Sequence, residues 1–186
     1  MRQIEKSITF ILLMSLMVSC KDNFITPNPE PVNLIDNPSF ETNGQPSLQS
    51  WWISYTVLSN IIQDAPPAGG KFSLELSPGW VPQVCFARAF VSGQSGTGMF
   101  KLTACMKNNS HGLLWRAYVS LGHMASNQWV RYKSISSDST NWTTVSIIDT
   151  MLLQASDTLA VQLSGGAAEL GFGHTLFDVV SLQRIQ

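Results

Sequence analysis

The feature that most limits the fold of this chain is a period-two alternation of apolar and polar residues, repeated in short runs. The alternation covers residues 72–76, 100–106, 115–121 and 159–163. Turn-forming pairs such as Pro78-Gly79 and Gly165-Gly166 separate these runs, and no stretch keeps a helical period over about twelve residues. Successive side chains of a strand point to opposite faces. The pattern therefore predicts one all-β domain, a jelly-roll β-sandwich of two antiparallel sheets.

The positions of the prolines and the net charge limit the possible folds and ligands further. All 9 prolines lie between Pro27 and Pro82, so the second half of the chain can form uninterrupted hydrogen-bonded ladders. Hydrophobic residues make up 44% of the 186 residues, which is enough for a sizeable core. The 11 basic and 12 acidic residues give a net charge of −1, without the basic footprint of a nucleic-acid-binding protein. The low charged fraction, 12%, suits a neutral ligand.

The first twenty residues have the features of a processing segment. Arg2 and Lys6 precede an apolar run over residues 8–18, which is too short for an ordinary transmembrane helix. The run ends in the sequence LMVSC at 16–20, which resembles a bacterial lipobox. The resemblance implies a lipoprotein signal peptide over 1–19 and a lipid anchor on Cys20 that holds the protein to a membrane. The alternative is a signal-anchor helix with an incidental cysteine.

Residues 20–32 are predicted to be a tether. Lys21 and Asp22 follow the cysteine and resemble signals that send some Gram-negative lipoproteins to the outer face of the outer membrane. We therefore expect an outer membrane lipoprotein that is exposed at the cell surface. Prolines alternate with other residues over 25–31, which favours an extended chain of roughly 3 Å per residue. The folded domain is predicted to occupy residues 33–186.

The sequence NLIDNPSFE at 33–41 resembles the first strand of carbohydrate-binding-module jelly rolls, of the type seen in families four, nine and twenty-two. These modules have a galactose-binding-like fold. Further matches follow in the order of the family: QSWW at 49–52, GKFSLEL at 70–76, FKLTACMK at 100–107, QW at 128–129, NWT at 141–143 and FDVVSL at 177–182. The resemblance spans residues 33–186 and implies a single carbohydrate-binding domain.

The resemblance also implies a structural calcium ion. Carried over position by position, the family's ligands are the side chains of Glu41 and Asp178 and backbone carbonyls near Ser39, Lys71 and Ser73. Calcium takes about 6–8 oxygen ligands, so such a site would tie together segments from both ends of the domain. Pro38 stands where the family usually has glycine. The alternative is that Glu41 and Asp178 cap turns or accept backbone hydrogen bonds.

The alternation also predicts a ligand-binding face. The apolar residues of the 115–121 run occupy the odd positions, so the others should point outward: Arg116, Tyr118 and Ser120. By the same rule Ala160, Gln162 and Ser164 point outward from a second strand, and Lys101, Thr103, Cys105 and Lys107 from a third. If these strands share a sheet, the face combines hydroxyls, an amide, cations and an aromatic ring, which suits a sugar. The alternative is an ordinary solvated sheet face.

The tryptophans offer a second candidate surface, because the family also binds ligands at the edge loops of the sandwich. Trp52, Trp80 and Trp129 lie near predicted loops or strand ends, and at least one of them is expected to be an exposed stacking platform. The other three are expected in the core: Trp51, Trp115 and Trp142.

Catalytic motifs are absent from the sequence. His111, His123 and His174 fall in predicted turns without metal-ligand spacing, and Ser95 does not lie in a GxSxG elbow. The carboxylates Glu41, Glu75, Asp149, Asp157 and Asp178 are interpreted as turn or solvated residues. We therefore expect a protein that is not an enzyme.

Two cysteines remain once Cys20 is assigned to the lipid anchor. A hairpin of residues 83–91 with 98–107 would place Cys85 opposite Cys105 and allow a disulfide. The family alignment instead places these strands in opposite sheets, and two unpaired thiols are the expected state.

Together these patterns predict a non-catalytic lipoprotein of the cell envelope or surface that binds a polysaccharide or oligosaccharide by aromatic stacking and hydrogen bonds. The alternative is a structural or adhesion lipoprotein that binds an envelope protein through the same sandwich. A jelly-roll lyase or hydrolase is the least favoured interpretation.

Overall fold

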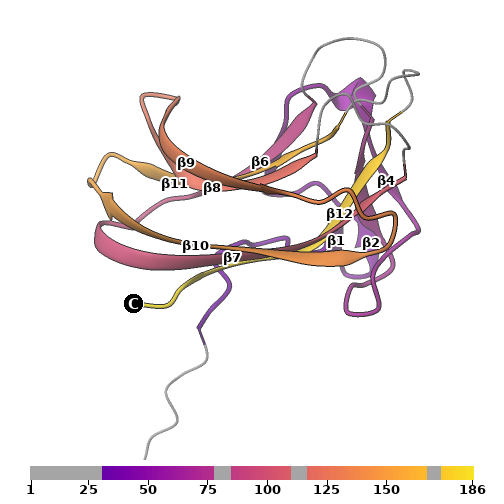
Figure 1. Ribbon diagram of the computed structural model, residues 1–186, viewed down its shortest axis with the longest axis horizontal. Coiled ribbons are helices and arrows are strands. Elements are labelled where there is room, and N and C mark those ends of the chain that lie inside the picture. The colour runs from indigo at the N-terminus through magenta and orange to yellow at the C-terminus, as the bar shows by residue number, and fades with distance from the viewer. Residues whose placement is uncertain (1–30, 78–84, 110–116, 167–172) are drawn as a thin grey trace, which may run out of the picture. The chain divides into compact units, whose positions relative to one another are not determined.

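The computed structural model describes residues 31–77, 85–109, 117–166 and 173–186. These residues form strands and one 3-10 turn (Figure 1). The elements are β1 (Glu41–Thr42), β2 (Gln45–Pro46), β3 (Trp51–Ile53), η1 (Thr56–Leu58), β4 (Ser59–Ile62), β5 (Ser73–Leu76), β6 (Phe86–Val91), β7 (Gly96–Asn108), β8 (Tyr118–Ala125), β9 (Gln128–Ser136), β10 (Thr143–Leu153), β11 (Thr158–Ser164) and β12 (Thr175–Arg184). Within the described ranges, no helix has the length and apolar character needed to span a membrane.

The strands form two five-stranded antiparallel sheets and a small β1–β2 ribbon. The upper sheet of Figure 1 has the order β3-β6-β11-β8-β9, and the lower sheet has the order β10-β7-β12-β5-β4. The two sheets face each other and enclose the core. The prediction of an all-β jelly-roll sandwich with two antiparallel sheets is confirmed.

The longest ladder shows how the sequence specifies the sheets. β10 and β7 pair continuously from Thr143 opposite Met106 to Leu153 opposite Gly96. Odd-numbered residues of β10 from Val145 onward are buried and even-numbered residues are exposed. This alternation is the period-two pattern of the sequence, and both strands lie beyond the last proline, as the prolines predicted.

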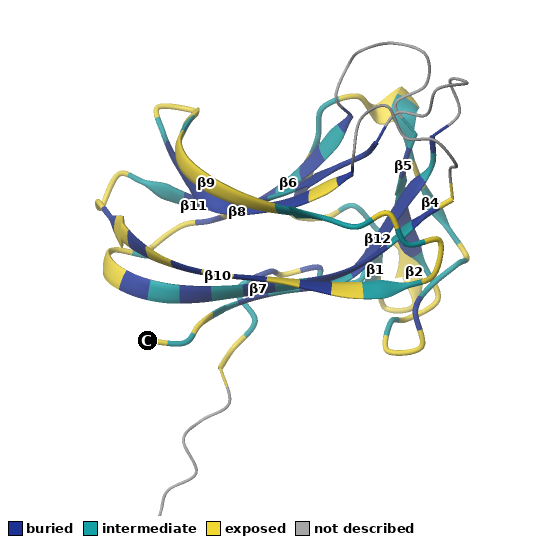
Figure 2. Ribbon diagram, viewed as in Figure 1, coloured by how far each residue is buried: buried dark blue, intermediate teal, exposed yellow. Residues whose placement is uncertain are grey.

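The core lies between the inner faces of the two sheets (Figure 2). Phe100 and Phe177 of the lower sheet and Leu121 and Leu163 of the upper sheet are fully buried there. Full burial of a side chain of this size contributes roughly 1.5–3 kcal/mol. The interdigitated inner faces therefore supply the main force that holds the sheets together.

The two ends of the domain are joined by backbone and side-chain hydrogen bonds. Leu34 N donates to the carbonyl oxygen of Leu182 at 2.7 Å. The Asn33 side chain donates to the Val180 carbonyl at 3.1 Å and accepts from the Leu182 amide at 2.9 Å. The segment that opens the domain thus docks on the last strand, β12.

The two described cysteines lie in different parts of the sandwich and are unpaired. β6, which Cys85 precedes, belongs to the upper sheet, whereas β7, which contains Cys105, belongs to the lower sheet. The hairpin that would have paired them does not form. Both side chains are buried, and burial raises the pKa of the Cys85 thiol to about 11. The expectation of two unpaired thiols is confirmed.

One carboxylate that the sequence assigned to a turn or to solvent lies inside the sandwich. Asp149 occupies a core-facing position of β10 and is 3% exposed. Its Oδ1 lies 2.9 Å from Arg131 Nη2 and 2.8 Å from Lys133 Nζ, both on β9 of the other sheet. The interpretation of Asp149 as solvated was wrong. Its two basic partners lie on a strand of the other sheet, and the sequence does not show that this strand faces β10.

Two further expectations about individual residues are corrected. His123 was predicted in a turn, but it is buried in β8, with Nε2 3.8 Å from Oδ2 of Asp157. Trp142 was expected in the core, but it precedes β10, is only half-buried and donates from Nε1 to Asp64 at 3.1 Å. Trp51 is buried as predicted. Trp115 and His111 lie outside the described residues.

Candidate functional site

The outer face of the upper sheet carries a row of side chains that crosses all five strands. The ladder registers align Trp52 with Arg88, Arg88 with Gln162, Gln162 with Ser120, and Ser120 with Ser134. In Figure 1 the strands of this sheet bend away from the lower sheet toward their ends, so this outer face is the inside of the bend. We call it the aromatic face, because rings border the row on both sides.

The neighbouring rows supply those rings. One row contains Phe86, Ser164, Tyr118 and Ser136, and the other contains Phe90, Ala160, Gly122 and Tyr132. Gly122 has a steric role, since a Cβ there would lie 2.2 Å from the Arg131 carbonyl oxygen and 2.7 Å from Cβ of Tyr132. Glycine at position 122 therefore lets β9 lie close against β8 where Tyr132 pairs with it.

The rings form two pairs that flank a cation. Trp52 packs against Phe86, and Trp129 packs against Tyr132, each with ring centroids 5.5 Å apart. The Arg88 guanidinium carbon lies 4.4 Å from the Phe86 ring centroid and 5.2 Å from that of Trp129. Both distances are within the range of cation–π attraction. Arg88 of β6 thus connects the aromatic residues of β6 with those of β9 across the intervening strands.

A short polar network lies in the middle of the aromatic face. Arg88 Nε donates to Gln162 Oε1 at 2.6 Å, and Gln162 Nε2 donates to Ser164 Oγ at 2.9 Å. On the other side of the row, the hydroxyl oxygens of Ser120 and Ser134 are 2.7 Å apart. Ser120 and Ser164 are buried, so they act by holding Ser134 and Gln162 in place beneath a polar ligand.

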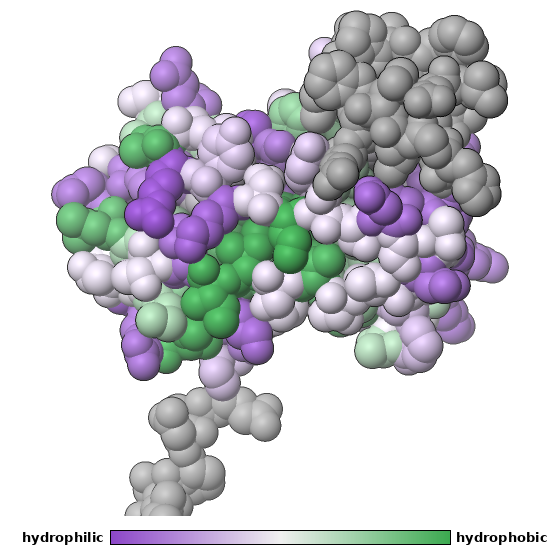
Figure 3. Space-filling view, in the orientation of Figure 1, coloured by the Kyte–Doolittle hydropathy of each residue, from purple (hydrophilic) through white to green (hydrophobic). Residues whose placement is uncertain are grey.

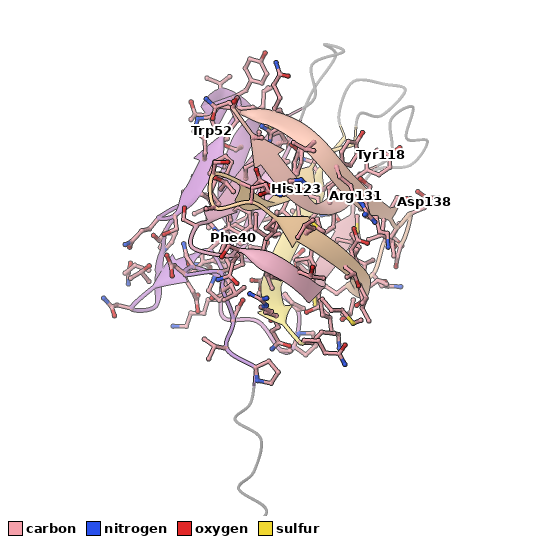
Figure 4. The ribbon with its side chains drawn as sticks, turned by 90° about the vertical axis from the view of Figure 1, so that its left-hand side faces the viewer. Phe40, Trp52, Tyr118, His123, Arg131 and Asp138 are labelled. Atoms are coloured by element: carbon pink, nitrogen blue, oxygen red, sulfur yellow. The ribbon has the colours of Figure 1, made fainter. Side chains whose placement is uncertain are left out.

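The structure brings together four of the six residues predicted to bind a ligand. Trp52, Tyr118, Trp129 and Gln162 all belong to the aromatic face. Trp52 and Tyr118 lie at opposite sides of the upper sheet (Figure 4) and are 51% and 40% exposed. The remaining two, Trp80 and Arg116, lie outside the described residues. Trp52 is thus an exposed tryptophan of the kind the sequence predicted.

Other parts of the predicted face are corrected. Three residues that were predicted to point outward occupy outward positions but are buried, because neighbouring side chains cover them: Ser120, Ala160 and Ser164. The strand 100–107 belongs to β7 in the lower sheet. Its lysines and Thr103 therefore cannot contribute to the aromatic face.

Sequence reasoning missed four members of the face: Phe86, Arg88, Phe90 and Tyr132. The run FARAFV at 86–91 has the same alternation as the other strands, and its apolar small residues Ala87 and Ala89 face the core. That signal could have placed three of the four on an outer face. Tyr132 carried a weaker signal, because its strand has no regular alternation and charged residues, Arg131 and Lys133, flank the ring on the inward positions.

A second site lies where the first strand meets the last. The Glu41 carboxylate accepts from the Lys71 amide at 3.0 Å, and Asp178 Oδ1 accepts from the Val179 amide at 2.7 Å. Two glycines allow this approach, since a Cβ on Gly69 would lie 2.1 Å from Asp178 Oδ2 and one on Gly70 would lie 1.8 Å from Glu41 Oε1. The loop before β5 therefore packs directly on both carboxylates, and Pro38 does not prevent it.

The carboxylate pair has unsatisfied oxygens and an altered ionisation. Asp178 is fully buried, and neither its Oδ2 nor the buried Ser73 Oγ has a hydrogen-bond partner. Burial and then the nearby Glu41 charge raise the pKa of Asp178 from 3.8 to about 7, although the Val179 amide opposes the shift. Val179 itself has φ 50°, a strained value for a β-branched residue, at an irregularity in β12.

These features fit a divalent cation that prefers oxygen ligands. A cation would stabilise two adjacent carboxylates and would satisfy buried oxygens that lack a hydrogen-bond donor. The described residues contain no cluster of three or more His, Cys, Asp or Glu side chains of metal-site geometry. The rest of the shell would therefore have to come from hydroxyl or carbonyl oxygens, as the resemblance implies for Ser39, Lys71 and Ser73.

The fold is the jelly-roll β-sandwich found in carbohydrate-binding modules. A family 16 carbohydrate-binding module has 21% identity and a TM-score of 0.59, covering 81% of this chain and 99% of its own. A family 61 module, solved in complex with beta-1,4-galactotriose, has 13% identity and a TM-score of 0.54, covering 82% and 99%. No protein-family model and no curated protein matches the sequence.

Enzymes are also among the structures with this fold. The enzymatically active domain of tailspike protein 4 of bacteriophage CBA120 has 14% identity and a TM-score of 0.62 over 83% of this chain. This chain spans only 22% of that tailspike chain. At such identities the likeness establishes the fold, and function must be argued from the residues of the site.

Proposed function

We propose that this protein is a non-catalytic glycan-binding protein whose site is the aromatic face. The observation that carries the proposal is the arrangement of Trp52, Phe86, Trp129 and Tyr132 around a row of hydrogen-bonding side chains. A pyranose ring presents apolar C–H groups on its faces and hydroxyls around its rim. The aromatic face offers a matching combination of rings for the faces and polar groups for the rim.

Binding would follow from the order of these groups across the sheet. Sugar rings would stack on the exposed ring of Trp52 at one side and of Tyr132 at the other. Hydroxyls between them would meet Gln162 and Arg88, which are already held by their mutual hydrogen bond. Because the side chains are fixed before the ligand arrives, little rotamer entropy is lost on binding. The described part of this face contains no paired carboxylates, so we propose no reaction there.

A polysaccharide-binding assay tests this proposal. Loss of the Trp52 or Tyr132 ring (W52A, Y132A) should weaken binding to the glycans retained by the wild type about 10-fold, since truncated aromatic anchors cost more than about 1 kcal/mol. Leu152→Ala is the matched control, because Leu152 is also a large, exposed apolar side chain (62%) but lies on β10 of the lower sheet. Binding that depends on Leu152 and ignores both rings would contradict the proposal.

The competing function, attachment to an envelope protein, also has an observation in its favour. Figure 3 shows an apolar patch bordered by hydrophilic side chains on the side of the molecule where β10 lies. Ile148 and Leu152 point outward from β10 and are 51% and 62% exposed. Exposed apolar patches often mark contacts with other proteins. In the same assay, this function predicts no retention by any polysaccharide.

We further propose that Glu41 and Asp178 hold a structural calcium ion, with oxygens near Ser39, Lys71 and Ser73. The unpartnered, buried Asp178 Oδ2 is the observation that supports this. The ion would neutralise the carboxylate pair and fix the loop before β5 to β12. It would lie apart from the aromatic face and take no part in ligand chemistry.

We also propose that Cys20 is lipidated and that the chain is an outer membrane lipoprotein of a Gram-negative bacterium, displayed at the surface. The chain enters the domain at Pro31, whose carbonyl accepts from Gln183 Nε2 on β12 at 3.2 Å. The tether therefore joins the domain at the lower sheet, whereas the aromatic face belongs to the upper sheet. A glycan could then be bound on the side away from the attachment point.

Cys20→Ser tests the anchor. Without the thiol no lipid can be attached, so the protein should move from the membrane fraction to the soluble fraction, and intact-mass measurement should show no acyl chains. Cys85→Ser is the control, because Cys85 is a buried thiol of the folded domain. A C20S protein that stays with membranes would favour the signal-anchor alternative.

A further inference from the structure

Within the part of the chain that the structure describes, the aromatic face carries one charged side chain and no opposite charge beside it. Its outward positions on β3, β6, β11, β8 and β9 carry aromatic, hydroxyl, amide and small side chains, together with Met124 and Arg88. Among the described residues, Arg88 has no ion-pair partner. The other cations of β9, Arg131 and Lys133, point to the opposite side of the strand and bind Asp149. Arg88 is therefore the single charged group that the described residues of this face present.

The Arg88 guanidinium is held in a fixed plane and is partly removed from water. Its carbon lies over the rings of Phe86 and Trp129, and its Nε donates to Gln162. Burial lowers the pKa of Arg88 below its ordinary value, and an arginine stays charged at neutral pH even so. A half-buried cation without a nearby anion is costly. The cost falls when a ligand supplies the anion.

From this geometry we propose that the aromatic face selects a glycan that carries anionic groups, carboxylate or sulfate, and that Arg88 is the residue that recognises them. With Nε held by Gln162, the terminal nitrogens of Arg88 remain as donors. A guanidinium binds a carboxylate or a sulfate through two parallel hydrogen bonds, which an ammonium group cannot reproduce. The rings beside Arg88 would stack on the sugar that carries the anionic group. This inference rests on the proposed glycan-binding function and names its ligand class.

The low overall charge of the chain had suggested a neutral ligand. The positions of the charged residues in the structure change that interpretation, because these residues are not spread evenly over the domain. The basic residues of β7 and β12 lie on the lower sheet, and those on the inner side of β9 are paired with Asp149. One unpaired cation between aromatic rings can set specificity even in a chain with a net charge of −1.

The test compares polymers that differ only in charge. The full chain, in detergent, is titrated with polygalacturonate and its carboxyl-reduced form, with alginate and its carboxyl-reduced form, and with dextran sulfate and dextran. We expect tighter binding to the charged member of at least one pair, weakening as salt rises. Arg88→Gln should lower that affinity about 10-fold to 100-fold and should weaken binding to the neutral member much less, so that the ratio of the two affinities falls about 10-fold. Arg88→Lys should restore only part of it, because it keeps the charge and loses the paired donors.

Arg184→Gln is the matched control, because Arg184 also lies over an aromatic ring, that of Phe100 at 5.7 Å, but on β12 of the lower sheet. Equal losses in R88Q and R184Q would mean unspecific charge attraction and would overturn the inference. So would equal affinity for charged and neutral polymers, or a preference that R88Q leaves intact. If R88Q does not fold, the R88K variant provides the test. Wild-type affinity of R88K for the charged polymer also overturns the inference. If the protein bound none of the six polymers and no other glycan, the proposed function itself would be overturned.

Discussion

Trp51→Ala should lower the free energy of unfolding by about 3–5 kcal/mol, the usual cost of truncating a fully packed tryptophan. Trp51 is 7% exposed, packs on Phe40 with ring centroids 5.0 Å apart, and donates from Nε1 to the Asn37 carbonyl at 2.8 Å. It also holds β3, which is only three residues long and lies at the edge of the upper sheet. Urea denaturation followed by circular dichroism measures the loss.

The adjacent residue provides the matched comparison. Trp52 points to the opposite face of the same strand and is half-exposed, so Trp52→Ala should cost less than about 1 kcal/mol in stability while weakening glycan binding. Trp51→Ala should weaken both, because β3 positions the Trp52 ring. If the two variants lost equal stability, or if W51A kept full binding, the assignment of one tryptophan to the core and the other to the site would be wrong.

The second large effect concerns pH and calcium. In a chelator, the Asp178 carboxyl should make the protein less stable as pH rises from about 4 to about 7. Its pKa is 3.8 ordinarily and about 7 in the folded chain, so in that window the folded state holds a proton that the unfolded state has lost. A shift of this size corresponds to an effect on the order of 4 kcal/mol. Urea denaturation at a series of pH values measures it.

Calcium should reverse this dependence. At pH 8, where Asp178 is ionised, millimolar calcium should raise the urea midpoint, and at pH 4.5, where the carboxyl is protonated, it should have little effect. Asp178→Asn is the control, since it removes the titrating group and should flatten the pH dependence in the chelator. Identical unfolding curves in calcium and in chelator at pH 8 would contradict the calcium proposal. An unchanged slope in D178N would contradict the assignment to Asp178.

Local patterns carried the prediction of the fold and part of the site. Alternation along a strand decides which residues share a face, so Tyr118 and Gln162 could be placed outward before their strands were known to be neighbours. The pairing of Glu41 with Asp178 came instead from the resemblance of residues 33–41 and 177–182 to the family's first and last strands. The outward positions depended on spacing within short segments, which the sequence displays directly.

What the sequence could not supply was the pairing between segments. Nothing within residues 86–91 indicates that β6 lies between β3 and β11, which is what places Arg88 beside Trp52 and Gln162. The same limit explains why β7 was expected to join the ligand face and why Asp149 was interpreted as solvated. In each case the deciding partner is a strand of distant sequence position, and its choice depends on the packing of the whole sandwich.

The docking of Leu34 on Leu182 has a consequence for how the chain acquires its structure. The first segment of the domain has no strand to pair with until the final residues are available, and β12 also lies at the centre of its sheet. Folding dominated by such long-range pairings is slow. The lower sheet and the docked first segment would therefore stay open in a nascent chain until β12 has been synthesised, and an open segment is the state in which a polypeptide can be threaded through a translocation channel.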